Sequence, residues 1–211
     1  MAGGRLITVE GLDGAGKTTL IGALSGALHE RGREVLVLRE PGGVALSERI
    51  RALVKDPALA VDPHAEALLY AAARAQLVTE QLRPLLADGR WIVLDRFVDS
   101  SLAYQGAGRE LGIEEVRRLN RFATGGLTPD RTLLLRIDPA VGLARVAGRA
   151  EDADRLEREA GAFFDRVAAA YDALAAAEPE RVVVIDAAQG PRAVLADAVR
   201  ALEPLLADEP A

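Results

Sequence analysis

Residues 7–19 of the chain read Ile7-Thr8-Val9-Glu10-Gly11-Leu12-Asp13-Gly14-Ala15-Gly16-Lys17-Thr18-Thr19. This stretch runs from an apolar, β-branched segment into a glycine-rich turn and then directly into a helix-forming sequence. Its positions Gly11, Gly16, Lys17 and Thr18 satisfy the pattern G-x-x-x-x-G-K-[ST]. The sequence therefore predicts a strand, a phosphate-binding loop and a helix in direct succession.

The chemistry of such a loop explains its spacing. Glycines allow the backbone to curl so that successive N–H groups point at phosphate oxygens, and the positive end of the following helix adds to this field. Lys17 supplies a mobile charge for the β- and γ-phosphates, and the Thr18 hydroxyl is placed to bind Mg²⁺. We therefore expect a nucleoside triphosphate and magnesium as ligands.

Composition sets limits on the class of protein. The chain has 211 residues, of which 50% are apolar and 27% charged, and this suits one globular domain spanning residues 1–211. A net charge of −6 argues against extended contact with nucleic acid or an anionic membrane. The first strand starts too early for a signal peptide, and no apolar run is long enough to span a bilayer. We expect a cytoplasmic protein.

Apolar segments alternate with helical patterns along the chain. After the first strand, further strands are predicted at residues 34–38, 91–95, 131–137 and 181–185. Because most of these strands are uniformly apolar, we expect an α/β, three-layer fold with a five-stranded parallel sheet flanked by helices on both faces. Ligands of such sheets bind beyond the carboxyl ends of the strands. The site should therefore include the polar residues that follow the strands.

Helical segments fill the intervals between these strands. Asp62-Pro63 opens a long helix in which Pro84 predicts a kink. A further helix, which includes residues 163–174, carries an aromatic stripe that we assign to the core. An amphipathic stripe is also predicted at Leu46, Ile50, Leu53 and Val54, and the core-facing residues of the aromatic stripe are Phe163, Val167, Tyr171 and Leu174.

A phosphate-binding loop leaves the reaction open, and the rest of the chain narrows it. No N-K-x-D motif is present, which weakens a GTPase interpretation, and Asp13 and Asp95 are the obvious candidates for a general base. Isolated arginines suit an acceptor that is itself a phosphate, because a nucleoside monophosphate is already ionised and needs cations more than a base. These arginines are Arg39, Arg74, Arg96, Arg149 and Arg155.

Two alternatives stay open on the residues alone. A deoxynucleoside kinase, or another nucleotide kinase on the same fold, would need a carboxylate base for a neutral hydroxyl and would have less use for Arg39. A nucleotide-gated switch or partition-type ATPase would act through partner proteins and hydrolyse its nucleotide slowly.

Several stretches together resemble the thymidylate kinases, particularly the bacterial form, in the P-loop nucleoside monophosphate kinase family. They are Glu10 to Thr19, Arg39-Glu40-Pro41-Gly42-Gly43, Leu69 to Gln76, Asp95-Arg96-Phe97, Ala103-Tyr104-Gln105-Gly106 and Asp154-Arg155-Leu156-Glu157. The resemblance covers nearly the whole chain in order. It implies ATP-dependent phosphorylation of dTMP to dTDP with magnesium, for dTTP synthesis, by direct phosphoryl transfer.

The resemblance also implies roles for individual residues at the phosphate end. Asp13 would bind the 3′-hydroxyl of dTMP, Arg96 would bridge toward the transferring phosphoryl group, and Arg39 would seat the acceptor phosphate. Asp95 would orient Arg96 or join Thr18 at the magnesium. The residues implied to bind ATP are Gly11, Leu12, Asp13, Gly14, Ala15, Gly16, Lys17, Thr18, Thr19, Arg149 and Arg155, and those implied to be catalytic are Lys17, Arg96, Arg149 and Asp13.

At the base end, the resemblance implies that Tyr70 stacks on thymine and that Arg74 donates to a base carbonyl. Ser101 and Gln105 would complete base recognition, and Tyr104 would pack against the deoxyribose. Residues 147–159 would form a mobile lid over ATP, with Arg149 as the first choice of catalytic arginine and Arg155 as the second.

The resemblance further implies a homodimer formed by packed helices. Surplus apolar faces at residues 46–54 and 68–77 are consistent with a homodimer, although a thick monomer core would explain them equally well.

Overall fold

The computed structural model describes residues 3–148, 155–159 and 161–207. Its centre is a parallel sheet with the strand order β2-β3-β1-β4-β5. The sheet confirms the predicted five-stranded parallel arrangement, and the strand positions agree with the sequence to within one or two residues. The strands are β1 Arg5–Gly11, β2 Val35–Arg39, β3 Trp91–Asp95, β4 Arg131–Arg136 and β5 Val182–Asp186.

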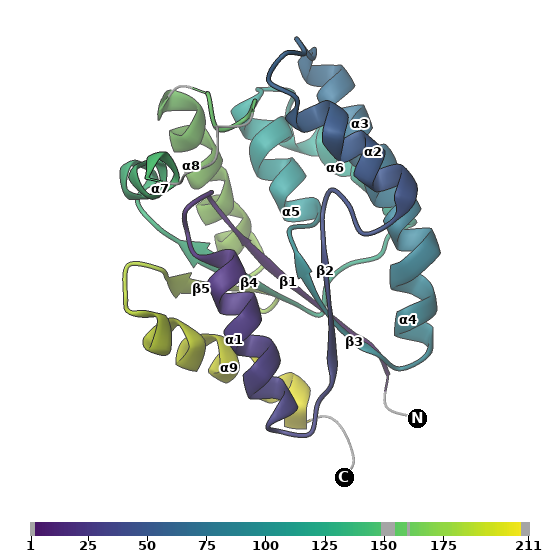
Figure 1. The fold of residues 1–211 in the computed structure, drawn as a ribbon, viewed down its shortest axis with the longest axis vertical. Coiled ribbons are helices and arrows are strands. Elements are labelled where there is room, and N and C mark those ends of the chain that lie inside the picture. The colour runs from purple at the N-terminus through teal and green to yellow at the C-terminus, as the bar shows by residue number, and fades with distance from the viewer. Residues whose placement is uncertain (1–2, 149–154, 160, 208–211) are drawn as a thin grey trace.

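Helices cover both faces of this sheet (Figure 1). The α-helices are α1 Lys17–His29, α2 Ala45–Lys55, α3 Pro63–Leu77, α4 Arg83–Ala87, α5 Val98–Ser101, α6 Ile113–Thr124, α7 Pro139–Ala147, α8 Gly161–Ala177 and α9 Pro191–Ala207, with π-helical segments at Val78–Leu82 and Leu102–Gly108. Helices α1 and α9 pack side by side on one face, whereas α4, α5 and α8 lie on the other. This is the three-layer arrangement expected from the alternating pattern.

Helix α1 begins at the end of the glycine-rich loop. Gly16, immediately before it, has a φ angle of 95°, a left-handed conformation that glycine adopts without strain. Leu20, Leu24 and Leu28 are buried against the sheet, as their spacing predicts. Gly32, with a φ angle of 77°, follows the helix and lets the chain turn toward β2. The loop is therefore held between a buried strand and a buried helix.

The predicted kink at Pro84 coincides with a change in helix type. Residues Val78–Leu82, directly before α4, are π-helical. Proline has no N–H to donate and its ring crowds the preceding turn, so regular α-helical bonding is interrupted just before it and resumes in α4. Asp62 caps the start of α3 by accepting hydrogen bonds from the backbone N–H groups of His64 and Ala65, as Asp-Pro predicts.

Of the two predicted stripes, one is buried throughout and the other only in part. In α2, Ile50 and Val54 are buried, but Leu46 and Leu53 are each 48% exposed, so the predicted stripe is only half covered. In α8 the whole aromatic stripe is buried, as expected for core. Tyr171 also places its hydroxyl against Glu10 and Ser100, so it is more than a packing residue. Among the described residues, no helix has the length and apolar character needed to cross a membrane.

Gly11 ends β1 and lies opposite Leu135 of β4. A Cβ atom at Gly11 would lie 2.4 Å from the Leu135 carbonyl oxygen, and its φ angle of +134° strains any other residue. We expect Gly11→Ala to lower the free energy of unfolding by about 2–3 kcal/mol, measured by urea denaturation.

The matched control is Gly22→Ala in the middle of α1, where an added Cβ meets no atom within 4 Å. There the same change should raise the free energy of unfolding by about 0.5–1 kcal/mol, because alanine is a better helix former. Equal effects at the two positions would contradict the steric explanation for Gly11.

Candidate active site

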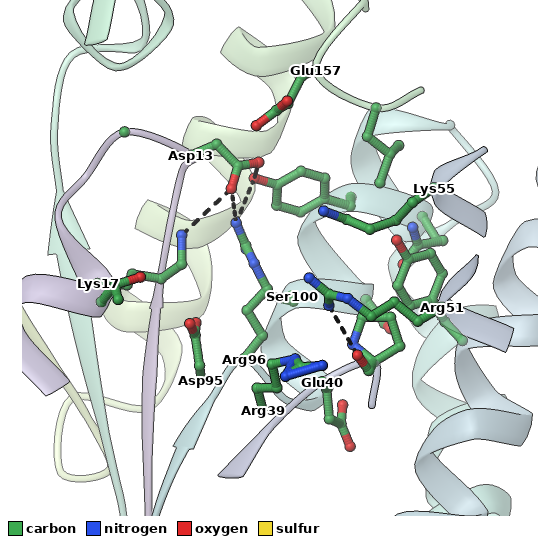
Figure 2. Close-up of a pocket in the computed structure, with 18 of the residues that line it drawn as sticks. Asp13, Lys17, Arg39, Glu40, Arg51, Lys55, Asp95, Arg96, Ser100 and Glu157 are labelled. Atoms are coloured by element: carbon green, nitrogen blue, oxygen red, sulfur yellow. Dashed lines mark hydrogen bonds and ion pairs between the residues drawn. The ribbon is translucent and has the colours of Figure 1, made fainter. Parts of the chain in front are cut away.

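A cavity of about 660 Å³ lies beyond the carboxyl ends of β1, β2 and β3. The phosphate loop forms one side, and Arg51 and Lys55 of α2 reach into it from the opposite side (Figure 2). The cavity brings together most of the residues that the sequence assigns to the site: Asp13, Gly14, Gly16, Lys17, Thr18, Thr19, Arg39, Tyr70, Arg74, Asp95, Arg96, Ser101, Tyr104 and Gln105. Residues far apart in the chain therefore converge at the predicted edge of the sheet.

Lys17 lies folded back on the loop that precedes it. Its Nζ atom donates to the carbonyl oxygens of Gly11 at 3.2 Å and Leu12 at 3.0 Å, and lies 3.7 Å from Oδ1 of Asp13. Burial, and then the nearby charge of Arg96, lower the pKa of the Lys17 amine to about 8, against the opposing effect of Asp13. A bound polyphosphate would supply the negative charge that this buried amine lacks.

Asp13 connects the phosphate loop to the residues after β3. Its Oδ1 atom accepts a hydrogen bond of 2.7 Å from Arg96, and its Oδ2 atom lies 3.4 Å from the Tyr104 hydroxyl (Figure 2). Burial alone would raise the pKa of the Asp13 carboxyl, but the charges of Arg96 and Lys17 hold it well below its usual range. Asp13 therefore stays ionised and is poorly suited to act as a general base near neutral pH.

Arg96 has an unusual backbone conformation, and a buried carboxylate holds the segment that follows it. Its φ angle of 69° is rare for a residue with a side chain. Glu10 lies fully buried nearby and accepts hydrogen bonds from the backbone N–H of Phe97 at 2.7 Å and of Ser100 at 3.2 Å. The Ser100 hydroxyl donates to Glu10 at 2.5 Å and accepts from Arg96 at 3.0 Å, and the Tyr171 hydroxyl donates to Glu10 at 2.8 Å.

This arrangement makes Glu10 the anchor of the segment that carries Arg96. Burial, reinforced by the charge of Asp99, raises the pKa of the Glu10 carboxyl. The sequence placed Glu10 only within the stretch that resembles thymidylate kinases and assigned Tyr171 to the core, and it did not single out Ser100. Their pairing with Glu10 joins positions 90 and 161 residues away in the chain, so no local pattern reports it.

Asp95 is the residue whose surroundings fit a cation. It lines the cavity, and its Oδ1 atom is buried without a hydrogen-bond partner among the described residues. Within the same residues, no group of three or more His, Cys, Asp or Glu side chains is placed to hold a metal. A magnesium ion would therefore take most of its oxygens from nucleotide phosphates and water, as is common for this ion. Asp95 and Thr18 as its protein contacts stay a prediction.

Arg74 lies almost fully buried at the far end of the cavity. It donates to Glu40 through Nε at 2.7 Å, to Ser101 through Nη1 at 2.8 Å and to the Phe97 carbonyl through Nη2 at 2.9 Å. It also donates to Asn120 and forms an ion pair of 2.6 Å with Glu40. All five donors of the guanidinium are thus engaged with the protein. The predicted contact with a base carbonyl stays a prediction and requires Arg74 to share or exchange a partner.

Glu40 is the partner of Arg74 within this cluster. Burial raises the pKa of the Glu40 carboxyl to about 7, even though the Arg74 charge opposes the shift. Its Oε2 atom binds Arg74, and its Oε1 atom is buried without a partner among the described residues.

The remaining residues predicted for the base side line the cavity, and their contacts with the base stay a prediction. Tyr70 is half-buried, and Ser101 and Gln105 are buried at its wall. Tyr104 is buried with its ring beneath the Arg96 guanidinium, at 5.0 Å from carbon to ring centre. Gln105 and Tyr104 both come from the π-helical segment Leu102–Gly108.

Arg39 lies half-exposed at the mouth of the cavity, where it forms hydrogen bonds of 2.8 and 2.9 Å with Glu48. Arg51 and Lys55 of α2 also line the cavity, and Arg51 donates to the Pro41 carbonyl at 2.9 Å. Neither of these two residues was predicted. Their spacing of four residues on one helix, offset from the buried Ile50 and Val54, is the sequence signal that points to a shared basic face.

Of the two arginines assigned to the lid, Arg155 lies among the described residues and Arg149 does not. Arg149 lies outside the described residues, as does much of the predicted lid at residues 147–159. Arg155 is described, and its guanidinium donates to the Val54 carbonyl at 3.0 Å and to Glu66 at 2.5 Å. Its neighbours Leu156 and Glu157 line the cavity, but Arg155 does not. Its contact with ATP stays a prediction.

Comparisons with known proteins agree with this geometry. A family model described as thymidylate kinase matches residues 9–198. The chain belongs to the thymidylate kinase family. It is 50% identical over 200 residues to the thymidylate kinase of Lactobacillus delbrueckii subsp. bulgaricus, covering 93% of this chain and 94% of that protein. This membership confirms the resemblance indicated by the sequence motifs.

Other members of the thymidylate kinase family are similarly close. The thymidylate kinase of Deinococcus radiodurans is 50% identical over 187 residues, covering 89% of this chain and 90% of that protein. A crystal structure of thymidylate kinase from Ehrlichia chaffeensis superposes with a TM-score of 0.76 at 28% identity, covering 95% of this chain and 99% of that chain.

The buried charge of Lys17 has a measurable consequence for stability. Its pKa is about 8 in the folded protein against 10.5 for an exposed lysine, so between these pH values the unfolded chain binds more protons. The free energy of unfolding should therefore rise with pH across this window, relative to Lys17→Met, by up to about 3 kcal/mol. Urea denaturation of both proteins from pH 7 to 10.5 measures this difference, and parallel curves would contradict it.

Proposed function

We propose that this chain transfers the γ-phosphoryl group of ATP to dTMP, producing dTDP and ADP. The observation that carries the proposal is the hydrogen bond between Asp13 of the phosphate loop and Arg96, inside one cavity that also holds the predicted base-side residues. This charged pair joins the end of the cavity proposed to bind ATP to the end proposed to bind the acceptor. Membership of the thymidylate kinase family supports dTMP as the acceptor.

The charges of the cavity suit an acceptor that is already ionised. Lys17, Arg39, Arg51, Lys55 and Arg96 all line the cavity, so cations surround the space where two phosphates would meet. They offset the repulsion between donor and acceptor and hold both in line, which is the main requirement of phosphoryl transfer. The low pKa of Asp13 leaves it unsuited to deprotonate a neutral hydroxyl, and this disfavours a deoxynucleoside kinase.

The proposed ligands follow from the positions of the side chains. The loop amides and Lys17 bind the phosphates of ATP, and Thr18 and Asp95 contact a magnesium ion that neutralises developing charge. Asp13 and Tyr104 contact the deoxyribose. Tyr70, Arg74, Ser101 and Gln105 surround thymine.

The single domain over residues 1–211, the lid at residues 147–159 with Arg149 as its catalytic arginine, and a cytoplasmic location belong to the same proposal. The single domain and the location rest on length and composition, and the lid with its arginine rests on the family resemblance.

A coupled assay of ADP release tests the reaction. With dTMP as acceptor we expect rapid ADP release, against little with ATP alone or with thymidine. Lys17→Ala should lower kcat by at least about a thousandfold while the far-UV circular dichroism spectrum is retained, because its charge stabilises the transferring phosphate. Preference for thymidine would overturn the choice of acceptor. ATP hydrolysis that ignores dTMP would favour a nucleotide-gated switch.

A homodimer forms the second part of the proposal. Leu46 and Leu53 of α2 and Leu68 of α3 are exposed by 48%, 48% and 57%, and Phe122 of α6 is exposed by 89%. Helices α2, α3 and α6 pack against one another in series. Large apolar side chains exposed on adjacent helices are typical of a protein–protein interface.

The dimer proposal predicts that a charge on this helical layer separates the subunits. Leu53→Glu should shift the sedimentation coefficient from the dimer to the monomer value, because an unpaired carboxylate is costly to bury in an interface. Val184→Glu, on the edge strand β5 with a similar exposure of 49%, is the matched control and should leave the mass unchanged. A wild-type chain that sediments as a monomer would refute the interface.

A further inference from the structure

Glu66 of α3 is fully buried, and nothing in the proposed transfer uses its carboxylate. It accepts hydrogen bonds from three side chains that come from different parts of the chain. Gln105 donates through Nε2 at 2.8 Å, Arg155 through Nη2 at 2.5 Å, and Arg109 lies within 3.1–3.3 Å through Nη2 and Nε. Only Gln105 among these three lines the cavity.

The two carboxylate oxygens of Glu66 differ in their shortest contacts. Oε2 accepts from Arg155 at 2.5 Å and pairs with Nη2 of Arg109 at 3.1 Å, whereas Oε1 accepts from Gln105 at 2.8 Å; Nε of Arg109 lies 3.3 Å from both oxygens. A carboxylate paired with two guanidinium groups can only accept hydrogen bonds. Gln105 must therefore turn its NH₂ group toward Glu66. Its amide oxygen is the atom left to face the cavity.

We propose that Glu66 sets base specificity by fixing the amide of Gln105, so that the acceptor pocket presents an oxygen to the N3–H group of thymine. The inference rests on the proposed function, in which Gln105 contacts the base. Thymine carries a hydrogen on N3, whereas cytosine carries a lone pair there. An oxygen at this position therefore accepts from thymine and repels cytosine, and a site built around one hydrogen-bond direction discriminates strongly against the other.

The substitution Glu66→Gln reverses this direction with little change of shape. Arg155 and Arg109 still need an acceptor, so the new amide oxygen stays at the Oε2 position. The new NH₂ group then faces Gln105, whose own oxygen turns toward it. Gln105 is left presenting NH₂ to the cavity, where it opposes the N3–H of thymine and suits the N3 of cytosine.

The experiment compares kcat/KM for dTMP and dCMP in the full-length enzyme. For Glu66→Gln we expect the dTMP-to-dCMP ratio to fall about ten- to hundredfold, because a donor then faces a donor. A merely structural role would lower both values together and leave the ratio unchanged, which would overturn the inference.

A double variant provides the rescue. In Glu66→Gln/Gln105→Glu, the new carboxylate at position 105 accepts from the amide at position 66 and again presents an oxygen to the cavity. The ratio should return to within about threefold of wild type. If Glu66→Gln alone does not fold, the double variant still tests the inference. A dTMP-to-dCMP ratio that stays lowered about tenfold or more in the double variant would overturn it.

Glu159→Gln is the matched control for the loss of charge. Glu159 accepts from the other side of Arg109 at 2.5 Å and does not touch Gln105, so its removal should leave the ratio unchanged. An equal fall of the ratio in this variant would overturn the inference.

Gln105→Leu tests the proposed contact of Gln105 with the base separately from the role of Glu66. If this change leaves the dTMP-to-dCMP ratio unaltered, the proposed contact of Gln105 with the base is wrong, and the proposed role of Glu66 is then wrong as well. Absence of dTMP phosphorylation in the wild-type chain would instead refute the proposed function.

Discussion

The hydrogen-bonded ion pair between Asp13 and Arg96 is the interaction on which the rest of the site depends. It joins the phosphate loop to the segment after β3, and it lies where the two reactants must meet. Glu10 fixes the backbone on one side of this pair, and the burial of β1 and α1 fixes the loop on the other. Asp13 stays ionised and Arg96 stays protonated in this pair, so the pair acts through charge and position and does not transfer a proton.

The cavity concentrates positive charge in a chain whose net charge is −6. Carboxylates pair with several of these cations: Asp13 with Arg96, Glu48 with Arg39, and Glu40 with Arg74. Cations that line the cavity are thus held in place by acidic partners within the protein. Such support limits the conformations open to long side chains before a ligand binds, which reduces the entropy that binding must offset.

Local patterns were sufficient to predict the sheet and the phosphate loop, and the resemblance to thymidylate kinases added most of the base-side residues that line the cavity. Strand burial follows from uniform apolar runs, and Lys17 and Thr18 follow from a motif within eight residues. The supporting residues could not be predicted in this way, because their partners are remote: Glu10 binds Tyr171, and Glu66 binds Arg155. The exposed Leu46 and Leu53 show the same limit, since a helical stripe does not state what covers it.

The contact between the phosphate loop and α7 has a consequence for how the family can vary. A Cβ atom at Gly14 would lie 2.3 Å from the Gly142 carbonyl oxygen, and one at Gly142 would lie 2.8 Å from the Asp13 carbonyl oxygen. The two backbones touch with no room for a methyl group between them. A relative with a larger residue at either position must therefore hold α7 farther from the loop, and Arg145 of this helix, which donates to the Gly14 carbonyl at 3.2 Å, would be displaced with it.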